Sequence, residues 1–263
     1  MALTIVQVDA FTDKPFAGNP AAVCILPGPK GERWMQDVAR EMNLSETAFL
    51  HRENDGYRLR WFTPAVEVAL CGHATLASAH VLWQDRHVPE GARARFHTQS
   101  GVLTAERRGD WIELDFPATP ATPAQPPAGL VEALGAASAW VGRSRFDYLV
   151  ELETEDVVRR LAPDFGALAR AEARGVIVTS RASTPESDFV SRFFAPRAGV
   201  NEDPVTGSAH CTLAPFWSQR LGKTEMVAYQ ASARGGVVRV RVQGDRVILG
   251  GQAVTVLRGE LVY

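Results

Sequence analysis

The stretch C-G-H-A-T-L-A at positions 71–77 has a counterpart, T-G-S-A-H-C-T-L-A, at positions 206–214. Each stretch follows another shared motif, R-W-F-T-P at 60–64 in the first half and R-F-F-A-P at 192–196 in the second. The offset is 132 residues between these motifs (192 minus 60) and 135 between the glycines (207 minus 72). A repeat of over a hundred residues is too long for a solenoid. The shared order predicts two pseudo-equivalent domains that face each other.

The composition is that of an ordinary soluble globular protein. The chain has 263 residues, of which 46% are hydrophobic and 22% charged, and its net charge is −2. That charge argues against a nucleic acid or an anionic membrane surface as the main partner, and the local basic cluster at 86–95 is expected to be a solvated face. No stretch approaches the roughly 20 apolar residues of a membrane helix.

Two further features predict a cytoplasmic location. The N-terminal M-A-L-T-I-V-Q-V-D-A-F alternates apolar and polar residues like a strand and lacks the pattern of a signal peptide. Three widely spaced cysteines, Cys24, Cys71 and Cys211, suit a reducing compartment without a disulfide framework.

The chain pattern predicts short strands and a few helices on both sides of a proline-rich segment. Residues 117–129, P-A-T-P-A-T-P-A-Q-P-P-A-G, should be extended and semi-rigid. We therefore predict an N-terminal domain at 1–116, a linker at 117–129 and a C-terminal domain at 130–263. The alternative for the last strand of the chain is that it joins the N-terminal domain. The strands expected on hydrophobic periodicity lie at 4–8, 22–26, 45–50, 57–62, 102–106, 111–116, 146–152, 175–179 and 189–194. The expected helices lie at 31–43, 72–82, from 154, and at about 207–221.

Both repeated helices begin with a glycine, Gly72 or Gly207, followed by a polar residue, His73 or Ser208. A helix N-terminus offers free backbone N–H groups and the positive end of the dipole, and glycine lets a ligand come close. One such helix start is most often an ordinary glycine-led helix. Two of them, one per domain, predict a shared site for a small anion such as a carboxylate.

The densest polar segment is N-E-D-P-V-T-G-S-A-H at 201–210. Asp203 precedes a proline and starts a turn, while Thr206 is expected to cap the following helix. In isolation Asp203 would be another cap. Opposite a second helix start it becomes a candidate partner for an amine or hydroxyl of a ligand.

Among the histidines, His73 is the candidate proton carrier, and its position at a helix start is expected to lower its pKa. His80 and His210 are expected to be packed helix residues. We expect no metal site, since no His or Cys motif has ligand spacing, and no nucleotide or flavin cofactor, since no phosphate loop or dinucleotide fingerprint is present.

Glu46 raises a separate question, because it lies within the strand-like stretch N-L-S-E-T-A-F-L at 43–50. On a surface strand this carboxylate would be solvated and would have no functional role. A strand that lines a cleft would hold it half-desolvated, as a proton shuttle requires. Cys71 could be a thiol activated at a helix start, but its counterpart in the repeat is Thr206, which favours a packing role.

Four motifs together resemble the phenazine-biosynthesis PhzF-like family. They are V-D-A-F-T-D-K-P-F-A-G-N-P-A-A-V at 8–23, N-L-S-E-T-A-F at 43–49, F-T-P-A-V-E-V-A-L-C-G-H-A-T at 62–75 and N-E-D-P-V-T-G-S-A-H at 201–210. The resemblance covers essentially the whole chain. It implies the α+β fold of diaminopimelate epimerase, with two pseudo-symmetric domains, each a mixed β-barrel around a central helix, and an active site between them.

The resemblance also implies roles for particular residues. Glu46 would be the single general acid/base, and His73 and Asp203 would hydrogen-bond the substrate and assist proton movement. The substrate carboxylate would meet Gly72, Gly207 and Ser208, with Ser45 and Asn19 lining the first-domain side. In the phenazine enzyme, a carboxylate moves a proton between two ring carbons of a dihydro-hydroxyanthranilic acid without a cofactor.

Three functions are therefore compared. The leading one is a cofactor-independent isomerase that shifts a proton on a small carboxylate-bearing, cyclic or acyclic, substrate. The second is an amino-acid racemase or epimerase, independent of pyridoxal phosphate, that uses Cys71. The third is a non-catalytic small-molecule-binding protein of the same fold. A homodimer is expected from the architecture alone.

Overall fold

The computed structural model describes residues 3–262, which divide into two compact units. Residues up to 115 and from 250 onward form the first unit, and residues 116–249 form the second. The last strand of the chain therefore belongs to the first unit. Residues 117–129, predicted as a linker, are part of the second unit, where the backbone N–H of Thr119 donates to the carbonyl of Cys211 at 3.0 Å.

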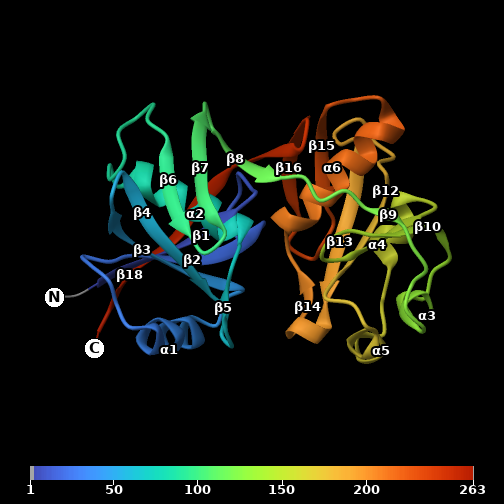
Figure 1. The fold of residues 1–263 in the computed structure, drawn as a ribbon, viewed down its shortest axis with the longest axis horizontal. Helices are drawn as coiled ribbons and strands as arrows, with labels where there is room; N and C mark the ends of the chain where they lie inside the picture. The colour runs from blue at the N-terminus through green and yellow to red at the C-terminus, as the bar shows by residue number, and fades with distance from the viewer. Residues whose placement is uncertain (1–2, 263) are drawn as a thin grey trace. The chain divides into compact units, whose positions relative to one another are not determined.

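The first unit is a mixed sheet with two helices (Figure 1). Its elements are β1 (Leu3–Ala10), β2 (Asn19–Ile25), α1 (Glu32–Met42), β3 (Glu46–Glu53), β4 (Gly56–Phe62), β5 (Glu67–Val68), α2 (Gly72–Gln84), β6 (Ala94–Thr98), β7 (Gly101–Arg108), β8 (Trp111–Pro117) and β18 (Ala253–Leu261).

The second unit has the same kind of mixed sheet, with more short helices. Its elements are β9 (Thr122–Pro123), α3 (Leu130–Leu134), β10 (Ser138–Arg143), β11 (Tyr148–Leu152), α4 (Glu155–Arg160), α5 (Phe165–Arg170), β12 (Val176–Arg181), β13 (Phe189–Ala195), the 3₁₀-helix η1 (Pro196–Ala198), β14 (Val200–Asp203), α6 (Gly207–Leu221), β15 (Glu225–Gln230), β16 (Gly236–Gln243) and β17 (Arg246–Gly251).

The two sheets repeat one pairing pattern. In the order β1-β2-β3-β4-β6-β7 of the first unit, successive pairs are antiparallel, parallel, antiparallel, parallel and antiparallel. The order β10-β11-β12-β13-β15-β16 of the second unit gives the same series. This agreement supports the α+β duplication predicted from the repeated motifs. A closed barrel, the remaining part of that expectation, is not detected among residues 3–262.

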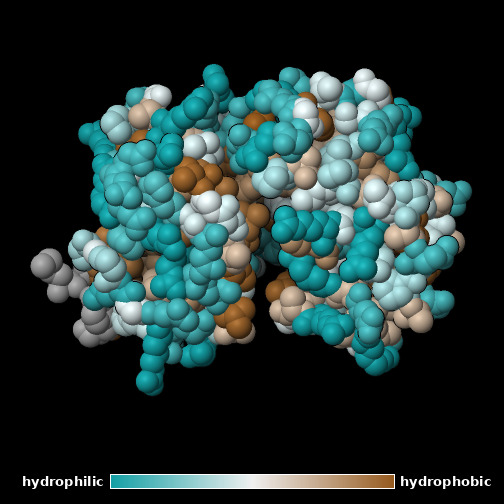
Figure 2. Space-filling view, viewed as in Figure 1, coloured by the Kyte–Doolittle hydropathy of each residue, from teal (hydrophilic) through white to brown (hydrophobic). Residues whose placement is uncertain are grey.

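The longest helix of each unit lies in its core. Ten of the thirteen residues of α2 and nine of the fifteen of α6 are buried, and α2 packs on β1, β2 and β3. A helix that is apolar on most sides is stable only when it is covered on most sides. Both helices begin at the predicted glycines, Gly72 and Gly207. The surface is mostly hydrophilic in the view of Figure 2, with smaller hydrophobic patches. No helix among the described residues is long and apolar enough to cross a membrane.

His80 and His210 are packed helix residues, as predicted. His80 Nε2 lies 3.1 Å from the Thr255 hydroxyl, and the buried His210 donates from Nδ1 to the carbonyl of Thr206 at 2.8 Å. Burial lowers the pKa of each ring to about 4, with Arg107 adding to the effect at His80.

We expect these two histidines to destabilise the protein in mild acid. Their folded pKa lies below the ordinary value of about 6.5, so the unfolded chain binds more protons between about pH 6.5 and pH 4. The stability that neutral rings provide is therefore complete above pH 6.5 and is lost as the pH falls through that window. The free energy of unfolding should drop by up to about 1.4 kcal/mol per pH unit for each histidine.

Urea titrations at several pH values measure this slope. His80→Gln or His210→Gln should remove about half of it, whereas His87→Gln, at an exposed histidine, should leave it unchanged. An unchanged slope in both helix variants would contradict the assignment.

Candidate active site

Three elements of the first unit bring four polar side chains together. Asn19 is the first residue of β2, and Glu46 is the first residue of the neighbouring parallel strand β3. Cys71 is the N-cap residue of α2, and His73 is the second residue of this helix. Because parallel neighbours start at the same edge of a sheet, Asn19 and Glu46 lie at one end of the unit, beside the start of α2. We call these four residues the Glu46 cluster.

His73 is the centre of the Glu46 cluster. Its Nε2 atom lies 3.2 Å from a carboxylate oxygen of Glu46. Its Nδ1 atom lies 3.2 Å from the side-chain amide nitrogen of Asn19 and 3.5 Å from the sulfur of Cys71. The exposed fraction of the side chain is 5% for His73 and 17% for Glu46. The Glu46 carboxylate is therefore mostly withdrawn from water but is not sealed off.

The hydrogen-bond partners of His73 determine where its proton lies. An amide NH₂ can only donate, so Nδ1 accepts from Asn19 and a neutral ring carries its proton on Nε2. The Nε2 atom lies next to the Glu46 carboxylate, but its N–H bond does not point at a carboxylate oxygen as it would in a regular hydrogen bond. The Glu46 carboxylate thus has a proton-bearing imidazole beside it.

The pKa of His73 moves in the direction opposite to the one predicted. Burial, the largest influence, lowers it, but the electrostatic and hydrogen-bonding interactions with Cys71 and Glu46 together outweigh burial and raise the pKa well above its usual value. Burial also raises the pKa of Cys71 to about 11, with Glu46 adding to the effect, so this thiol stays protonated near neutral pH. The prediction was wrong because it considered only the helix dipole. The Glu46 carboxylate also acts on His73, and the local sequence does not show that it lies beside the ring.

The turn before β2 fixes the position of Asn19. Gly18 has a φ of +63°, and a Cβ there would lie 2.2 Å from the carbonyl oxygen of Ala10. Only glycine fits that approach. Asn19 itself is fully buried, and its observed partner is His73; its role as a substrate contact stays a prediction. Ser45, directly before Glu46, and Gly72 are half-buried.

The remaining predicted site residues, Asp203, Gly207 and Ser208, belong to the second unit. Asp203 ends β14, and Gly207 starts α6 with Ser208 in its first turn. Thr206 occupies the N-cap position without capping the helix, contrary to the prediction. Its hydroxyl donates instead to the Asp203 carboxylate at 2.5 Å, so it orients that carboxylate.

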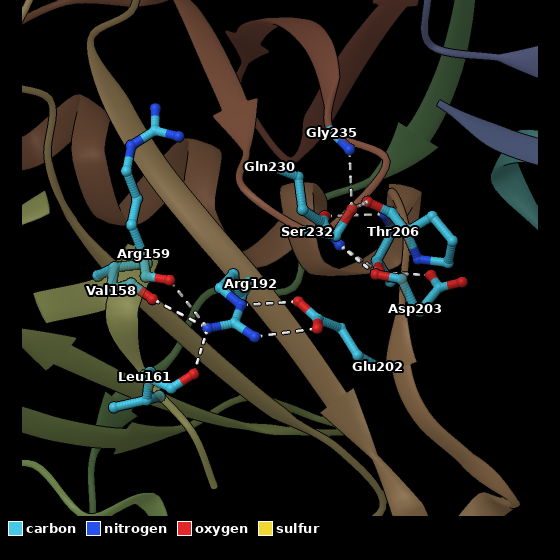
Figure 3. Close-up of polar contacts among 11 residues, drawn as sticks. Val158, Arg159, Leu161, Arg192, Glu202, Asp203, Thr206, Gln230, Ser232 and Gly235 are labelled. Carbon is cyan, nitrogen blue, oxygen red and sulfur yellow. Dashed lines mark hydrogen bonds and ion pairs between the residues drawn. The ribbon is translucent and has the colours of Figure 1, made fainter. Parts of the chain in front are cut away.

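Gln230, which no sequence pattern singles out, holds this loop (Figure 3). Gln230 ends β15 and is fully buried. Its side-chain oxygen accepts from the backbone N–H of Thr206 at 2.9 Å, and its amide nitrogen donates to the Asp203 carbonyl at 2.7 Å and to the Thr206 hydroxyl at 3.2 Å. One side chain thus fixes both ends of the D-P-V-T turn. Nothing in the local sequence Y-Q-A signals this role, since the partners lie 24 to 27 residues away.

We expect Gln230→Leu to loosen the turn that carries Asp203. It would leave a buried N–H of Thr206 and the Asp203 carbonyl without their partner, at a cost of about 1–3 kcal/mol in the free energy of unfolding. Urea denaturation measures this loss. Gln243→Leu, at an exposed position that ends β16, is the matched control and should change stability by less than about 0.5 kcal/mol. Equal effects of the two substitutions would contradict the role given to Gln230.

The loops before α2 and α6 are anchored by the same pair of contacts. Arg60 forms a bidentate pair with Glu67 at 2.7 and 2.6 Å, and Arg192 forms one with Glu202 at 2.7 and 2.9 Å. The two arginines are the first residues of the repeated R-W-F-T-P and R-F-F-A-P motifs. The duplication therefore extends to the side chains that position both helix starts.

A second repeated contact joins each loop to a serine. The Ser100 hydroxyl donates to the Ala69 carbonyl at 2.8 Å, and the Ser232 hydroxyl donates to the Pro204 carbonyl at 2.8 Å. The offsets are 132 for the serines and 135 for their acceptors, the same two values as for the sequence motifs.

The fold and these sites define an α+β protein of the duplicated epimerase type, and comparisons with known proteins agree. The family model described as "Phenazine biosynthesis-like protein" matches residues 8–259. An uncharacterized isomerase of Halalkalibacterium halodurans is 56% identical over 100% of this chain and 99% of its own length. The crystal structure of a PhzF-family phenazine biosynthesis protein from Enterococcus faecalis superimposes with a TM-score of 0.95 at 42% identity, covering 100% of both chains.

The chain belongs to the phenazine biosynthesis-like (PhzF) family and is an isomerase. The wider fold is shared with a probable proline racemase from Agrobacterium radiobacter, at a TM-score of 0.67 and 11% identity, over 99% of this chain and 93% of that one. A likeness at that identity concerns the fold alone.

Proposed function

We propose that this isomerase moves a proton on a small carboxylate-bearing substrate, without a cofactor, and that Glu46 is its general acid/base. The observation that carries the proposal is the contact between the Glu46 carboxylate and His73, in a cluster where Asn19 holds the ring from behind. A general base needs a fixed position and a partner that stabilises its changes of charge. His73 is the proposed partner, because the proton on its Nε2 atom attracts the Glu46 carboxylate more strongly when Glu46 is ionised.

The helix start beside the cluster supports a carboxylate-bearing substrate. The backbone N–H groups of Gly72, His73 and Ala74 precede the first intrahelical bond of α2, which Thr75 makes to the carbonyl of Cys71. Such N–H groups, together with the helix dipole, favour an anion. We propose Gly72 and Ser45 as substrate contacts on this side, and Asp203, Gly207 and Ser208 as further contacts contributed by the second unit.

The rival racemase mechanism would need the Cys71 thiolate as a base. Burial, which raises the pKa of Cys71 to about 11, opposes that role near neutral pH. The cytoplasmic location and the homodimer remain predictions, and light scattering after size exclusion would test the latter.

The test is proton exchange in D₂O, followed by NMR, with dihydro-hydroxyanthranilate and a panel of small cyclic and amino-acid carboxylates. Deuterium entering one carbon position of a substrate, with a shifted double bond, would support the isomerase proposal. Exchange at the α-carbon of an amino acid that is lost in Cys71→Ser would favour the racemase. The absence of exchange across the panel, together with tight binding of one compound, would favour the non-catalytic binding protein.

A further inference from the structure

The Glu46 cluster contains three side chains of the types that bind metal ions, in an arrangement that no sequence motif reveals. A carboxylate oxygen of Glu46, the sulfur of Cys71 and a ring nitrogen of His73 all lie within 4.8 Å of one another. In a tetrahedral zinc site, bond lengths of about 2.0–2.3 Å place neighbouring ligand atoms about 3.5 Å apart. One separation already matches, the 3.2 Å from His73 Nε2 to Glu46. The 3.5 Å contact of Cys71 is with the other ring nitrogen, Nδ1, so its sulfur must move closer for one ion to bind all three side chains.

The chemistry of the three ligands selects a class of ion. One sulfur, one nitrogen and one oxygen suit a borderline-soft cation such as Zn²⁺ and do not suit Mg²⁺ or Ca²⁺, which prefer oxygen alone. A second observation also points to a ligand here: His73 is 4% exposed, and its Nε2 atom has no aligned hydrogen-bond acceptor. A bound cation would replace that missing interaction, while Asn19 remains in place to orient the ring.

We propose that Glu46, Cys71 and His73 bind one ion of the zinc class, and that this ion inhibits the isomerase by occupying the Glu46 carboxylate. The inhibitory part rests on the proposed role of Glu46; the binding itself does not. Three protein ligands leave a fourth position for water, as in an open zinc site.

The duplication of the chain predicts a single site. In the second unit, Thr206 stands where the first has Cys71, and Ser208 stands where it has His73. The second unit therefore has hydroxyl groups where the first unit has a thiol and an imidazole, so it lacks the sulfur and nitrogen ligands. Among the described residues, no other group of three His, Cys, Asp or Glu side chains approaches this arrangement.

Binding must release the proton of Cys71, because only a thiolate coordinates the metal strongly.

Cadmium provides a direct readout, because a cadmium–thiolate bond gives an ultraviolet charge-transfer band that is independent of enzyme activity. We expect the metal-free full-length protein to develop this band on titration with CdCl₂ and to saturate at one ion per chain. Cys71→Ser should abolish the band and Glu46→Gln should weaken binding. Cys24→Ser and Cys211→Ser remove the two other buried thiols and are the matched controls that should keep it.

The inhibitory part is tested with ZnCl₂ in the D₂O exchange assay. The loss of a residue that only orients a ligand costs about 10–100-fold in metal affinity, so the loss of a ligand should raise the inhibitory concentration more than about 100-fold in Cys71→Ser. A band that survives Cys71→Ser, or that disappears equally in Cys211→Ser, would overturn the site. A cadmium band without any isomerase activity would support the metal site while counting against the proposed function; Glu46-dependent activity without a band would do the reverse.

Discussion

Glu46→Gln is expected to reduce deuterium exchange into the substrate by about 10²–10⁴-fold, which is the usual contribution of a general acid/base. Glutamine has nearly the same shape, but it cannot take a proton from carbon and return it. The contact with His73 would also lose its ionic character. The Michaelis constant should change far less than kcat, because the helix-start N–H groups proposed to hold the substrate carboxylate are untouched.

The matched control for this prediction lies on the same strand. Glu53 is the last residue of β3, and its carboxylate lies 3.9 Å from His51, with 36% of the side chain exposed. Glu53→Gln removes an equal charge from an equal side chain outside the Glu46 cluster, and its exchange rate should stay within about twofold of the wild type. Substantial exchange by Glu46→Gln would refute the proposed role of this carboxylate.

Arg192→Leu is expected to lower the free energy of unfolding by about 3–5 kcal/mol, the range found when one partner of a buried ion pair is removed. Arg192 is 9% exposed and pairs with Glu202 through two hydrogen bonds (Figure 3). It also donates to the carbonyls of Val158 and Leu161, at 3.2 and 2.6 Å, at the C-terminal end of α4. Leucine would leave the Glu202 carboxylate and these carbonyls without partners.

The duplication supplies the control for Arg192. Arg60 makes the same bidentate pair with Glu67, in a more exposed place, with 22% of its side chain exposed against 11% for Arg192. No hydrogen bond from Arg60 to a helix carbonyl is seen among the described residues. Arg60→Leu should therefore cost at least about 1 kcal/mol less than Arg192→Leu, as measured by urea denaturation. Equal losses would mean that the carbonyl contacts contribute nothing.

Local sequence was sufficient for the elements whose pattern lies within a few residues. Helix α6 was predicted at 207–221 and is observed at Gly207–Leu221, because a glycine start followed by a long apolar run is a local signal. Strand β6 (Ala94–Thr98) was missed, although it alternates between buried and more exposed side chains. Arg95 and the basic cluster at 86–95 made the segment resemble a solvated face, and only pairing with β4 and β7 shows that its apolar residues face inward.

The sequence by itself determined the duplication, the family and the residue types that carry the proposed chemistry, because repeats and motifs need no knowledge of distant contacts. The tertiary structure alone decided how those residues act. In the tertiary structure, Glu46 lies next to His73, which is 27 positions away in the chain. The Thr206 hydroxyl donates to Asp203 and does not cap the helix, and Gln230 binds the backbone N–H of Thr206. These contacts follow from strand register and helix packing, which bring together side chains that have no pattern in common along the chain.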